Sequence, residues 1–271
     1  MNKKLIGRCL ACVGLEGTVR SLWYRILGSR ITRTISVGGH SCSFHCPNPM
    51  ISDSISSTNK ERPAIEWLLS RIHEGDVVWD IGANIGLWTL FLAKQVGATG
   101  KVVAFEPFEE ALPLLKSNMA LNGVTNVILR AEALGKQDGH VPLFPSRSGI
   151  LSTSSLAYRS GEFGTETEPT YVRIRSGASV IEEDSTLLPD AMKIDVEGAE
   201  QAVLEGFSPS IWQKLKSLAI EVHPGFLPSL GGTPEEVKRL IHDHNMKVVV
   251  ESSRRDTLHW LCVRDQEWNT R

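Results

Sequence analysis

Residues 77–88, with the sequence VVWDIGANIGLW, constrain the fold more than any other part of the chain. An apolar run ends in Asp80, Gly82 and Gly86 follow four residues apart, and a helical pattern begins after them. This order predicts a buried strand, a tight turn and a helix whose N-terminus faces a ligand, because glycine permits close backbone approach. The glycine spacing differs from the G-x-G-x-x-G pyrophosphate fingerprint. It therefore favours a compact ligand that lies close to the backbone.

Strands and helices alternate after this stretch, which predicts a mostly parallel sheet with helices on both faces. The expected strands begin at residue 77 and continue with 101–105, 127–131, 191–196, 218–222, 247–250 and 258–263, and the expected helices cover 85–95, 109–122, 199–205 and 234–244. The segment between the last two strands is too short for a crossover helix, so these strands must pair antiparallel. The expected fold class is α/β, with a mostly parallel seven-stranded sheet that ends in an antiparallel hairpin.

The first 59 residues differ in pattern from the rest, so we expect an appendage over 1–59 and a main domain over 60–271. Helical spacing predicts one or two helices within 1–30. Residues 32–44 read as a hairpin that turns at its two adjacent glycines, and residues 47–59 read as a polar loop. A helix with Pro63 in its first turn then leads into the central strand.

The alternation is interrupted between residues 135 and 180. Two short strands, 141–144 and 171–174, are expected to flank a loop rich in serine and glycine. A long polar loop of this kind is either a cover over a binding site or merely a long connection, and the sequence leaves both interpretations open.

Composition excludes some functions. The net charge of −2, with 22% charged and 41% hydrophobic residues, is typical of a soluble globular protein and gives no bulk attraction to nucleic acid or acidic membranes. No stretch reaches the roughly 18 apolar residues that a membrane span needs. The N-terminus begins like a signal peptide, but Arg8 and Glu16 interrupt its apolar run, so secretion is the less favoured interpretation.

The five cysteines are an odd number, which favours a reducing compartment and a cytoplasmic location over a disulfide framework. Two cysteine pairs, Cys9 with Cys12 and Cys42 with Cys46, have the close spacing that can indicate zinc ligands. However, no second pair has the spacing of a zinc finger or ribbon, so we expect small buried thiols.

Polar residues follow the ends of the expected strands, where an open α/β sheet binds its ligand. These residues are Asp80, Glu106, Glu132, Asp195 and His223. Glu106 ends the second strand, and an acid there can accept hydrogen bonds from both hydroxyls of a ribose. The alternative is an acid that only caps the next helix. Together with the glycine turn, the pattern favours a nucleoside-binding site.

The segment KIDVEGAE (residues 193–200) is the second informative stretch. In a strand, Lys193, Asp195 and Glu197 would share one face, and three charges there are costly unless they are paired or face a cleft. One interpretation is an ion pair of Lys193 with Asp195 or Glu221 that holds the sheet end together. The other places Asp195 and Glu197 at the mouth of the crevice, near a reacting group.

His223 ends the next strand, where it could act as a general base at neutral pH or serve only a structural purpose. Asp195, Glu221 and His223 could also ligate a divalent cation. Their spacing is not specific for a metal site, however, and no metal is expected.

These segments together resemble the FkbM-type methyltransferases. The resemblance is carried by residues 79–86, 103–107, 133–135, 192–200 and 220–222, and it covers roughly residues 60–263. The lysine-containing segment 193–200 is its most specific part, since the glycine turn alone indicates only a class I methyltransferase. The resemblance implies the Rossmann-like fold of that class, S-adenosylmethionine as cofactor, and transfer of its methyl group to a hydroxyl of a sugar, glycan or secondary metabolite.

Carried over by position, the resemblance implies a role for each site residue. The turn residues Gly82, Ala83, Asn84 and Gly86 would line the methionine end of the cofactor, Glu106 would hold the ribose and Glu132 would lie near the adenine, while Asp195 would face the methyl group. Asp80 belongs to the expected cofactor-binding set as well. The expected catalytic set is Asp195 or His223 as the base, with Lys193 and Glu197 beside them. The partner would be a small-molecule or glycan hydroxyl.

Two rival functions remain. A non-catalytic nucleoside-binding or partner-binding module of the same fold would bind the cofactor without turnover. A nicotinamide enzyme is disfavoured by the glycine spacing and by the antiparallel ending of the sheet.

Overall fold

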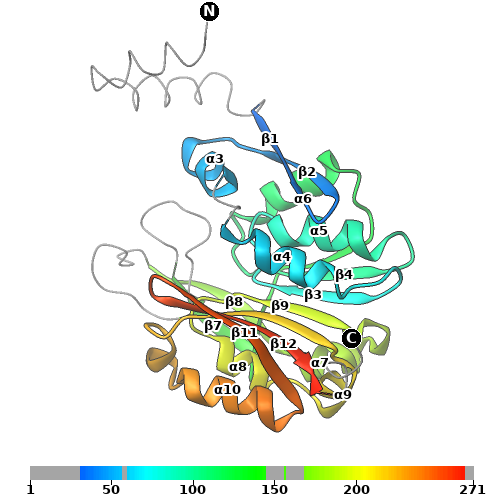
Figure 1. Ribbon diagram of the computed structural model, residues 1–271. Helices are drawn as coiled ribbons and strands as arrows, with labels where there is room; N and C mark the ends of the chain where they lie inside the picture. The colour runs from blue at the N-terminus through cyan, green and yellow to red at the C-terminus, as the bar shows by residue number, and fades with distance from the viewer. Residues whose placement is uncertain (1–30, 57–59, 145–155, 157–167, 266–271) are drawn as a thin grey trace, which may run out of the picture.

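A computed structural model describes residues 31–56, 60–144, 156 and 168–265 of the 271-residue chain. Its centre is a seven-stranded sheet (Figure 1) whose strands are β3 (Val77–Ile81), β4 (Lys101–Phe105), β5 (Val127–Arg130), β9 (Ala191–Ile194), β10 (Ser217–Val222), β11 (Met246–Arg254) and β12 (Thr257–Arg264). The strand order is β11-β12-β10-β9-β3-β4-β5. Neighbours from β10 to β5 pair parallel, and β12 pairs antiparallel with both β10 and β11. The expected fold class is therefore confirmed.

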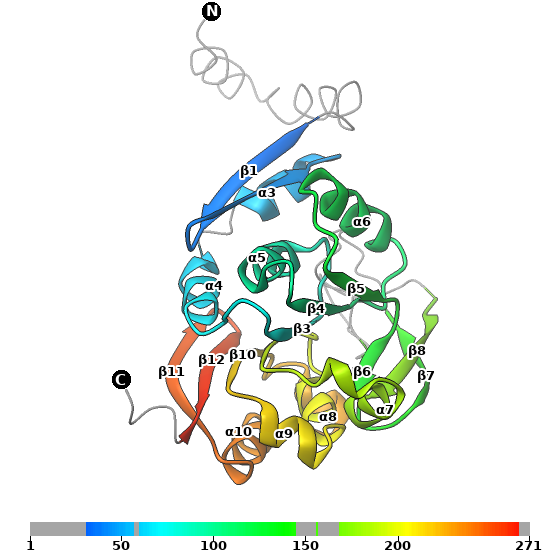
Figure 2. The ribbon, with the colours of Figure 1, turned by 90° about the vertical axis from the view of Figure 1, so that its right-hand side faces the viewer.

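Helices cover both faces of this sheet (Figures 1 and 2). On one side lie α4 (Arg62–Leu69), α5 (Leu87–Val96) and α6 (Leu112–Leu121), and on the other lie α8 (Glu200–Glu205), α9 (Pro209–Lys214) and α10 (Pro234–Asp243). The pleat of the strands separates the two cores, since alternate side chains point to opposite faces. In β3, Trp79 and Ile81 join one apolar cluster, whereas Val78, which points to the opposite face, joins the other.

The N-terminal hairpin forms as the sequence predicts. Strands β1 (Thr32–Val37) and β2 (His40–His45) pair antiparallel, and Gly38 and Gly39 both have positive φ, as a two-residue turn requires. The hairpin packs over α5 and α6 (Figure 2), and the amide oxygen of Asn118 in α6 accepts a hydrogen bond from the backbone N–H of His45 at 2.9 Å. Phe44 is buried in the same cluster as the α5 side chains.

The expectation of a polar loop over 47–59 is wrong for most of that range. Residues Pro49–Ser56 form helix α3, with Ile51 and Ile55 buried on one face. These two isoleucines are four residues apart, which is the spacing of one helical face. Their burial in the apolar cluster that also holds hairpin and α5 side chains stabilises this helix, which the polar composition of the segment did not indicate.

A second, three-stranded sheet accounts for the interruption of the alternation. Strand β6 (Ala133–Gly135) pairs parallel with β8 (Thr170–Ser176), and β8 pairs antiparallel with β7 (Gly139–Leu143). The sequence predicted strands β7 and β8. It did not predict strand β6, helix α7 (Gly177–Glu183), which follows β8, or helix α9. Most of the expected serine-rich loop, like the expected helices within 1–30, lies outside the described residues.

Among the described helices, none is long and apolar enough to cross a membrane. Cys42, Cys46 and Cys262 are buried free thiols, as expected, while Cys9 and Cys12 lie outside the described residues.

Candidate active site

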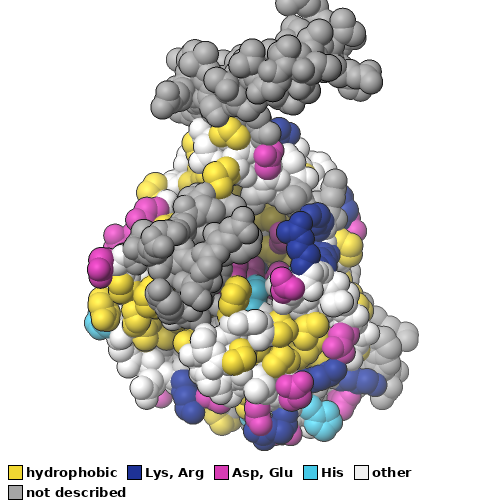
Figure 3. Space-filling view, turned by 90° about the vertical axis from the view of Figure 1, so that its left-hand side faces the viewer, with side chains coloured by type: hydrophobic (Ala, Val, Ile, Leu, Met, Phe, Trp, Pro, Cys, Tyr) yellow, Lys and Arg dark blue, Asp and Glu magenta, His cyan; other side chains and the backbone are white. Residues whose placement is uncertain are grey.

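A cavity opens at the carboxyl ends of β3, β4 and β9, where the fold predicts a ligand site. It has an empty volume of about 1010 Å³, part of which is open solvent. Its lining includes the expected residues Gly82, Ala83, Asn84, Glu106, Glu132, Lys193, Asp195 and Glu197. Figure 3 shows a hollow on this face of the molecule, with acidic side chains beside it.

The glycine turn forms one wall of the cavity. Gly82 has a φ of +81°, and a Cβ at this position would overlap the carbonyl oxygen of Asp195. Gly86 has a φ of +90° and precedes the first residue of α5. The turn is therefore shaped by the absence of two side chains.

Glu106 connects this turn to the end of β4. Its Oε2 accepts a hydrogen bond from the backbone N–H of Asn84 at 2.6 Å, and its Oε1 accepts one from Phe108 at 2.8 Å. Burial raises the pKa of Glu106 to about 7, against the opposing effect of these two hydrogen bonds. The carboxyl is thus held at the cavity wall and titrates near neutral pH.

Asp80 does not line the cavity but lies behind its wall. The side chain is fully buried, accepts a hydrogen bond from the hydroxyl of Thr89 at 2.5 Å, and lies 3.4 Å from Nζ of Lys193. Its place in the cofactor-binding set remains a prediction, and these contacts point to an indirect contribution through the turn.

Lys193 ties the glycine turn to the central strand β9. Its Nζ donates a hydrogen bond to the carbonyl of Gly82 at 2.6 Å and lies 3.8 Å from Asp195 Oδ2. Burial would lower the pKa of Lys193, but the charges of Asp80 and Asp195 outweigh that effect and raise it. The sequence offered Asp195 or Glu221 as the ion-pair partner of Lys193. The structure pairs Lys193 with Asp195, and among the described residues no ion pair joins Lys193 to Glu221.

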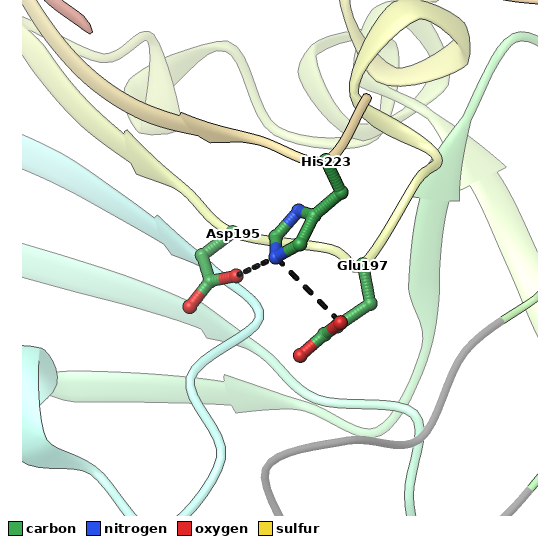
Figure 4. Close-up of side chains that lie close together, drawn as sticks. All are labelled: Asp195, Glu197 and His223. Atoms are coloured by element: carbon green, nitrogen blue, oxygen red, sulfur yellow. Dashed lines mark ion pairs between the residues drawn. The ribbon is translucent and has the colours of Figure 1, made fainter. Parts of the chain in front are cut away.

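Asp195, Glu197 and His223 meet beyond the ends of β9 and β10. His223 Nε2 lies 3.9 Å from Asp195 Oδ1 and 3.6 Å from Glu197 Oε2 (Figure 4). The expectation that Lys193, Asp195 and Glu197 share one face of a strand is wrong, because β9 ends at Ile194 and Glu197 has a φ of +53°. The backbone turn brings Glu197 toward His223 instead.

The surroundings of His223 favour its protonated form. Its Nδ1 lies 2.7 Å from Oε1 of the buried Glu200. Burial alone would lower the pKa of His223, but the bond to Glu200 and the charges of Asp195 and Glu197 raise it to about 9. An imidazole that holds its proton at neutral pH is a poor general base.

Glu132 follows β5, which is separated in the sheet by β4 and β3 from the β9 and β10 ends that carry this cluster. Its side chain is buried and forms two ion pairs, one with Arg130 at 3.1 Å and one with Arg173 at 3.6 Å. The two arginines therefore match the charge of Glu132. Its expected contact with adenine remains a prediction.

A residue that the sequence did not indicate is Glu61, just before α4. Its Oε2 accepts a hydrogen bond from the indole N–H of Trp88 at 2.8 Å, and it lines both the main cavity and a smaller neighbouring one. Lys193 and Asp195 also line both cavities, and Glu221 and His259 line the smaller one. No local pattern predicts Glu61, since it precedes a helix 19 residues before Asp80 in the chain.

The strand order, the glycine turn and the acid at the end of β4 together define the Rossmann-like methyltransferase fold. The sequence profile of the Methyltransferase FkbM domain matches residues 80–248 of the chain. The protein therefore belongs to the FkbM methyltransferase family.

The chain is also similar to two known methyltransferases. The chain is 26% identical over 220 residues to the hexuronic acid methyltransferase AglP of Haloferax volcanii, covering 81% of this chain and 84% of the relative. It is 28% identical over 207 residues to the 31-O-demethyl-FK506 methyltransferase FkbM of Streptomyces tacrolimicus, covering 66% and 76% of the two chains.

The similarity to solved structures is more distant. A precorrin-6y C5,15-methyltransferase from Geobacter metallireducens aligns with a TM-score of 0.43 at 14% identity, covering 74% of this chain and 87% of that one. The Streptococcus pneumoniae protein Sp1610, described as a putative tRNA (m1A22) methyltransferase and solved in complex with S-adenosyl-L-methionine, also aligns with a TM-score of 0.43, at 13% identity, covering 74% and 72%.

Proposed function

We propose that the protein is an O-methyltransferase that transfers the methyl group of S-adenosylmethionine to a hydroxyl of a sugar, glycan or secondary metabolite. The observation that carries the proposal is a single cavity that joins the glycine turn, the Glu106 carboxyl and Asp195. These groups suit the amino acid, the ribose and the reacting end of one nucleoside ligand.

The cofactor would lie across the carboxyl ends of β3 and β4. The turn from Gly82 to Asn84 would contact its methionine part, and the Glu106 carboxylate would accept hydrogen bonds from the ribose hydroxyls. Glu132, at the far end, would lie near the adenine. The backbone of the turn can approach the ligand closely because Gly82 has no side chain.

Asp195 is the base that the geometry favours. Its side chain is 32% exposed and lines both cavities, so it can reach an acceptor beside the cofactor. The sulfonium methyl is already electrophilic, so the chain must align the acceptor oxygen and help to remove its proton. Lys193 would position Asp195, and Glu197 and His223 would balance charge beside it.

The acceptor would enter through the smaller cavity next to Asp195. Glu61 and Glu221 line this cavity, and carboxyl groups there can form hydrogen bonds with several hydroxyls of one acceptor. The two relatives act, by their names, on a hexuronic acid and on an FK506 precursor, which supports a hydroxylated acceptor without choosing one. A cytoplasmic location remains a prediction, supported by the three buried free thiols.

The cofactor assignment is tested by calorimetric titration with S-adenosylmethionine. We expect Glu106→Ala to weaken binding about tenfold or more, because two charge-assisted hydrogen bonds to the ribose are lost. Glu109→Ala is the matched control, since Glu109 is exposed on the following segment and should leave the affinity unchanged. Equal affinities for the Glu106→Ala variant and the native chain would refute the ribose role.

Methyl transfer is tested with a radiolabelled methyl group and a panel of hydroxylated acceptors that includes uronic acids. We expect label in one acceptor class with the native chain and a large loss of turnover for Asp195→Asn at unchanged cofactor affinity. Cofactor binding without transfer to any acceptor of the panel would instead favour a non-catalytic nucleoside-binding module.

A further inference from the structure

The loops after β9 and β10 bring three potential metal ligands together. One oxygen each of Asp195 and Glu197 and one ring nitrogen of His223 all lie within 4.8 Å of one another. Figure 4 shows the imidazole directed toward both carboxylates. A fourth group, Glu221, has its Oε1 3.9 Å from the same Nε2. Three carboxyl groups therefore surround one imidazole nitrogen.

A residue outside this cluster determines which nitrogen faces it. Glu200 is fully buried, and its Oε1 accepts a hydrogen bond from the backbone N–H of Gly198 at 2.9 Å and lies 2.7 Å from His223 Nδ1. The acid thus holds the Nδ1 proton and leaves Nε2 directed at Asp195 and Glu197. A carboxylate on the remote nitrogen is the usual support of a histidine that ligates a metal.

The distances inside the cluster leave room for a cation in place of the Nε2 proton that the ring otherwise holds. A proton on Nε2 would draw one carboxylate oxygen to about 2.8 Å, the length of a charge-assisted hydrogen bond. The shortest separation is instead 3.6 Å, and the next is 3.9 Å. Two ligand atoms that lie about 2.1 Å from a common ion are about 3 to 3.5 Å apart. The ligand atoms of the cluster, which lie within 4.8 Å of one another, would therefore move closer together around a bound ion.

We propose that Asp195, Glu197 and His223 form a divalent-cation site. Two carboxylates and one imidazole are a mixed ligand set, which suits a cation such as Mn²⁺ that accepts both oxygen and nitrogen. His223 is only 4% exposed, while Glu197 and Asp195 both line the main cavity, so the open coordination positions of the ion would face that cavity.

The position of the site gives the cation a role that rests on the proposed methyl transfer. Asp195 lies on the boundary between the two cavities, where the acceptor hydroxyl is expected. A cation held there would coordinate this hydroxyl, lower its pKa and orient its oxygen toward the methyl group, and the Asp195 oxygen that does not ligate the ion would accept the proton. Lys193, on the other side of Asp195, would balance the remaining carboxylate charge.

The test is Mn²⁺ binding to the full chain without an affinity tag, measured from the loss of the free-ion signal in electron paramagnetic resonance. We expect saturable binding of one ion per chain. Asp195→Asn, Glu197→Gln and His223→Gln should each weaken the affinity about tenfold or more, and Glu200→Gln should weaken it about 10- to 100-fold through the orientation of His223.

Matched controls are His242→Gln and Glu251→Gln. The His242 side chain is 86% exposed and the Glu251 side chain pairs with Lys238, so neither change should alter Mn²⁺ affinity. Thermal unfolding identifies any variant that fails to fold. If the buried His223 does not tolerate the change, Glu197→Gln decides the question, because Glu197 lies on a loop with a 17% exposed side chain.

The absence of saturable Mn²⁺ binding to the native chain would overturn the site, as would equal losses in the control and cluster variants. The result does not depend on the proposed function, since Mn²⁺ binding is measured without cofactor or acceptor. A chain that binds S-adenosylmethionine and transfers methyl groups but binds no Mn²⁺ would refute the cation site alone. A chain that binds Mn²⁺ but transfers no methyl group would refute the proposed function alone.

Discussion

At the scale of single residues, Glu106 shows how the fold prepares a charged group for a ligand. The end of β4 places its carboxyl under the glycine turn, where two backbone N–H groups hold it. Burial nevertheless raises its pKa to about 7, so the carboxylate that a ribose needs is not fully formed at neutral pH.

This pKa predicts a pH dependence of cofactor binding. Ribose hydroxyls donate hydrogen bonds to the carboxylate, so protonation of Glu106 below pH 7 should weaken binding and deprotonation above it should restore full affinity. Between pH 8 and pH 6 we expect a loss of about tenfold by calorimetry, since the ionised fraction falls by about that factor. Glu106→Gln should bind more weakly at pH 8 and lose this component of the pH dependence, because an amide does not titrate. An equally steep profile in that variant would contradict the assignment.

His223 shows the limit of reasoning from residue type. A histidine at a strand end is a natural candidate for a general base, and the sequence offers nothing against that role. The carboxyl groups of Glu200, Asp195 and Glu197 make His223 a poor general base, because they stabilise a positive charge on the ring and raise its pKa.

At the scale of elements, the turn between β3 and α5 is the most constrained connection of the site. It must approach β9 closely, since Gly82 lies against the backbone of Asp195. Lys193 holds the same two segments together through the Gly82 carbonyl. The turn and the KIDVEGAE segment therefore form one structural unit across adjacent strands.

A side chain at Gly82 should disrupt this unit. We expect Gly82→Ala to destabilise the fold by about 3 kcal/mol or more in denaturant unfolding, because the backbone is left-handed there and the new Cβ meets the Asp195 carbonyl. Gly225→Ala is the matched control, since a Cβ at Gly225 meets nothing within 4 Å and its φ is not positive. Similar stabilities of the two variants would contradict the close approach.

At the scale of the whole molecule, the N-terminal hairpin belongs to the hydrophobic core of the main body. Phe44 and Val37 lie in one apolar cluster with Leu90 and Phe91 of α5. The expected division of the chain at residue 59 remains a prediction, although the hairpin and the main body share this apolar cluster.

Because the hairpin and the main body share one apolar cluster, a substitution in the hairpin core should destabilise the whole fold. We expect Phe44→Ala to lower the free energy of unfolding by about 3 to 5 kcal/mol, in one cooperative transition, because a fully buried ring leaves a cavity. Tyr171→Ala is the matched control, since Tyr171 is 70% exposed on β8 and its loss should cost little. A separate early transition for the Phe44 variant, with the remaining sheet unaffected, would show that the hairpin folds independently.

Prediction from the sequence succeeded where the information is local. The strand–turn–helix at 77–88, the alternation of elements and the antiparallel ending follow from spacing, glycine positions and loop length. Prediction failed for elements whose local sequence pattern is weak and whose stability depends on contacts with distant parts of the chain. Helix α3 is stabilised by the burial of two isoleucines, and β6 is a three-residue strand that exists only because β8 lies beside it.

The sequence by itself therefore determined the fold class, the family and the set of polar residues at the strand ends. Only the tertiary structure decided how these residues pair: Asp80 with Lys193, Glu61 with Trp88, and His223 with Glu200. The physical reason is that periodicity reports which face of its own element a side chain occupies. The strand order, by placing β3 between β4 and β9, decides which distant side chains share that face and therefore which charges are matched.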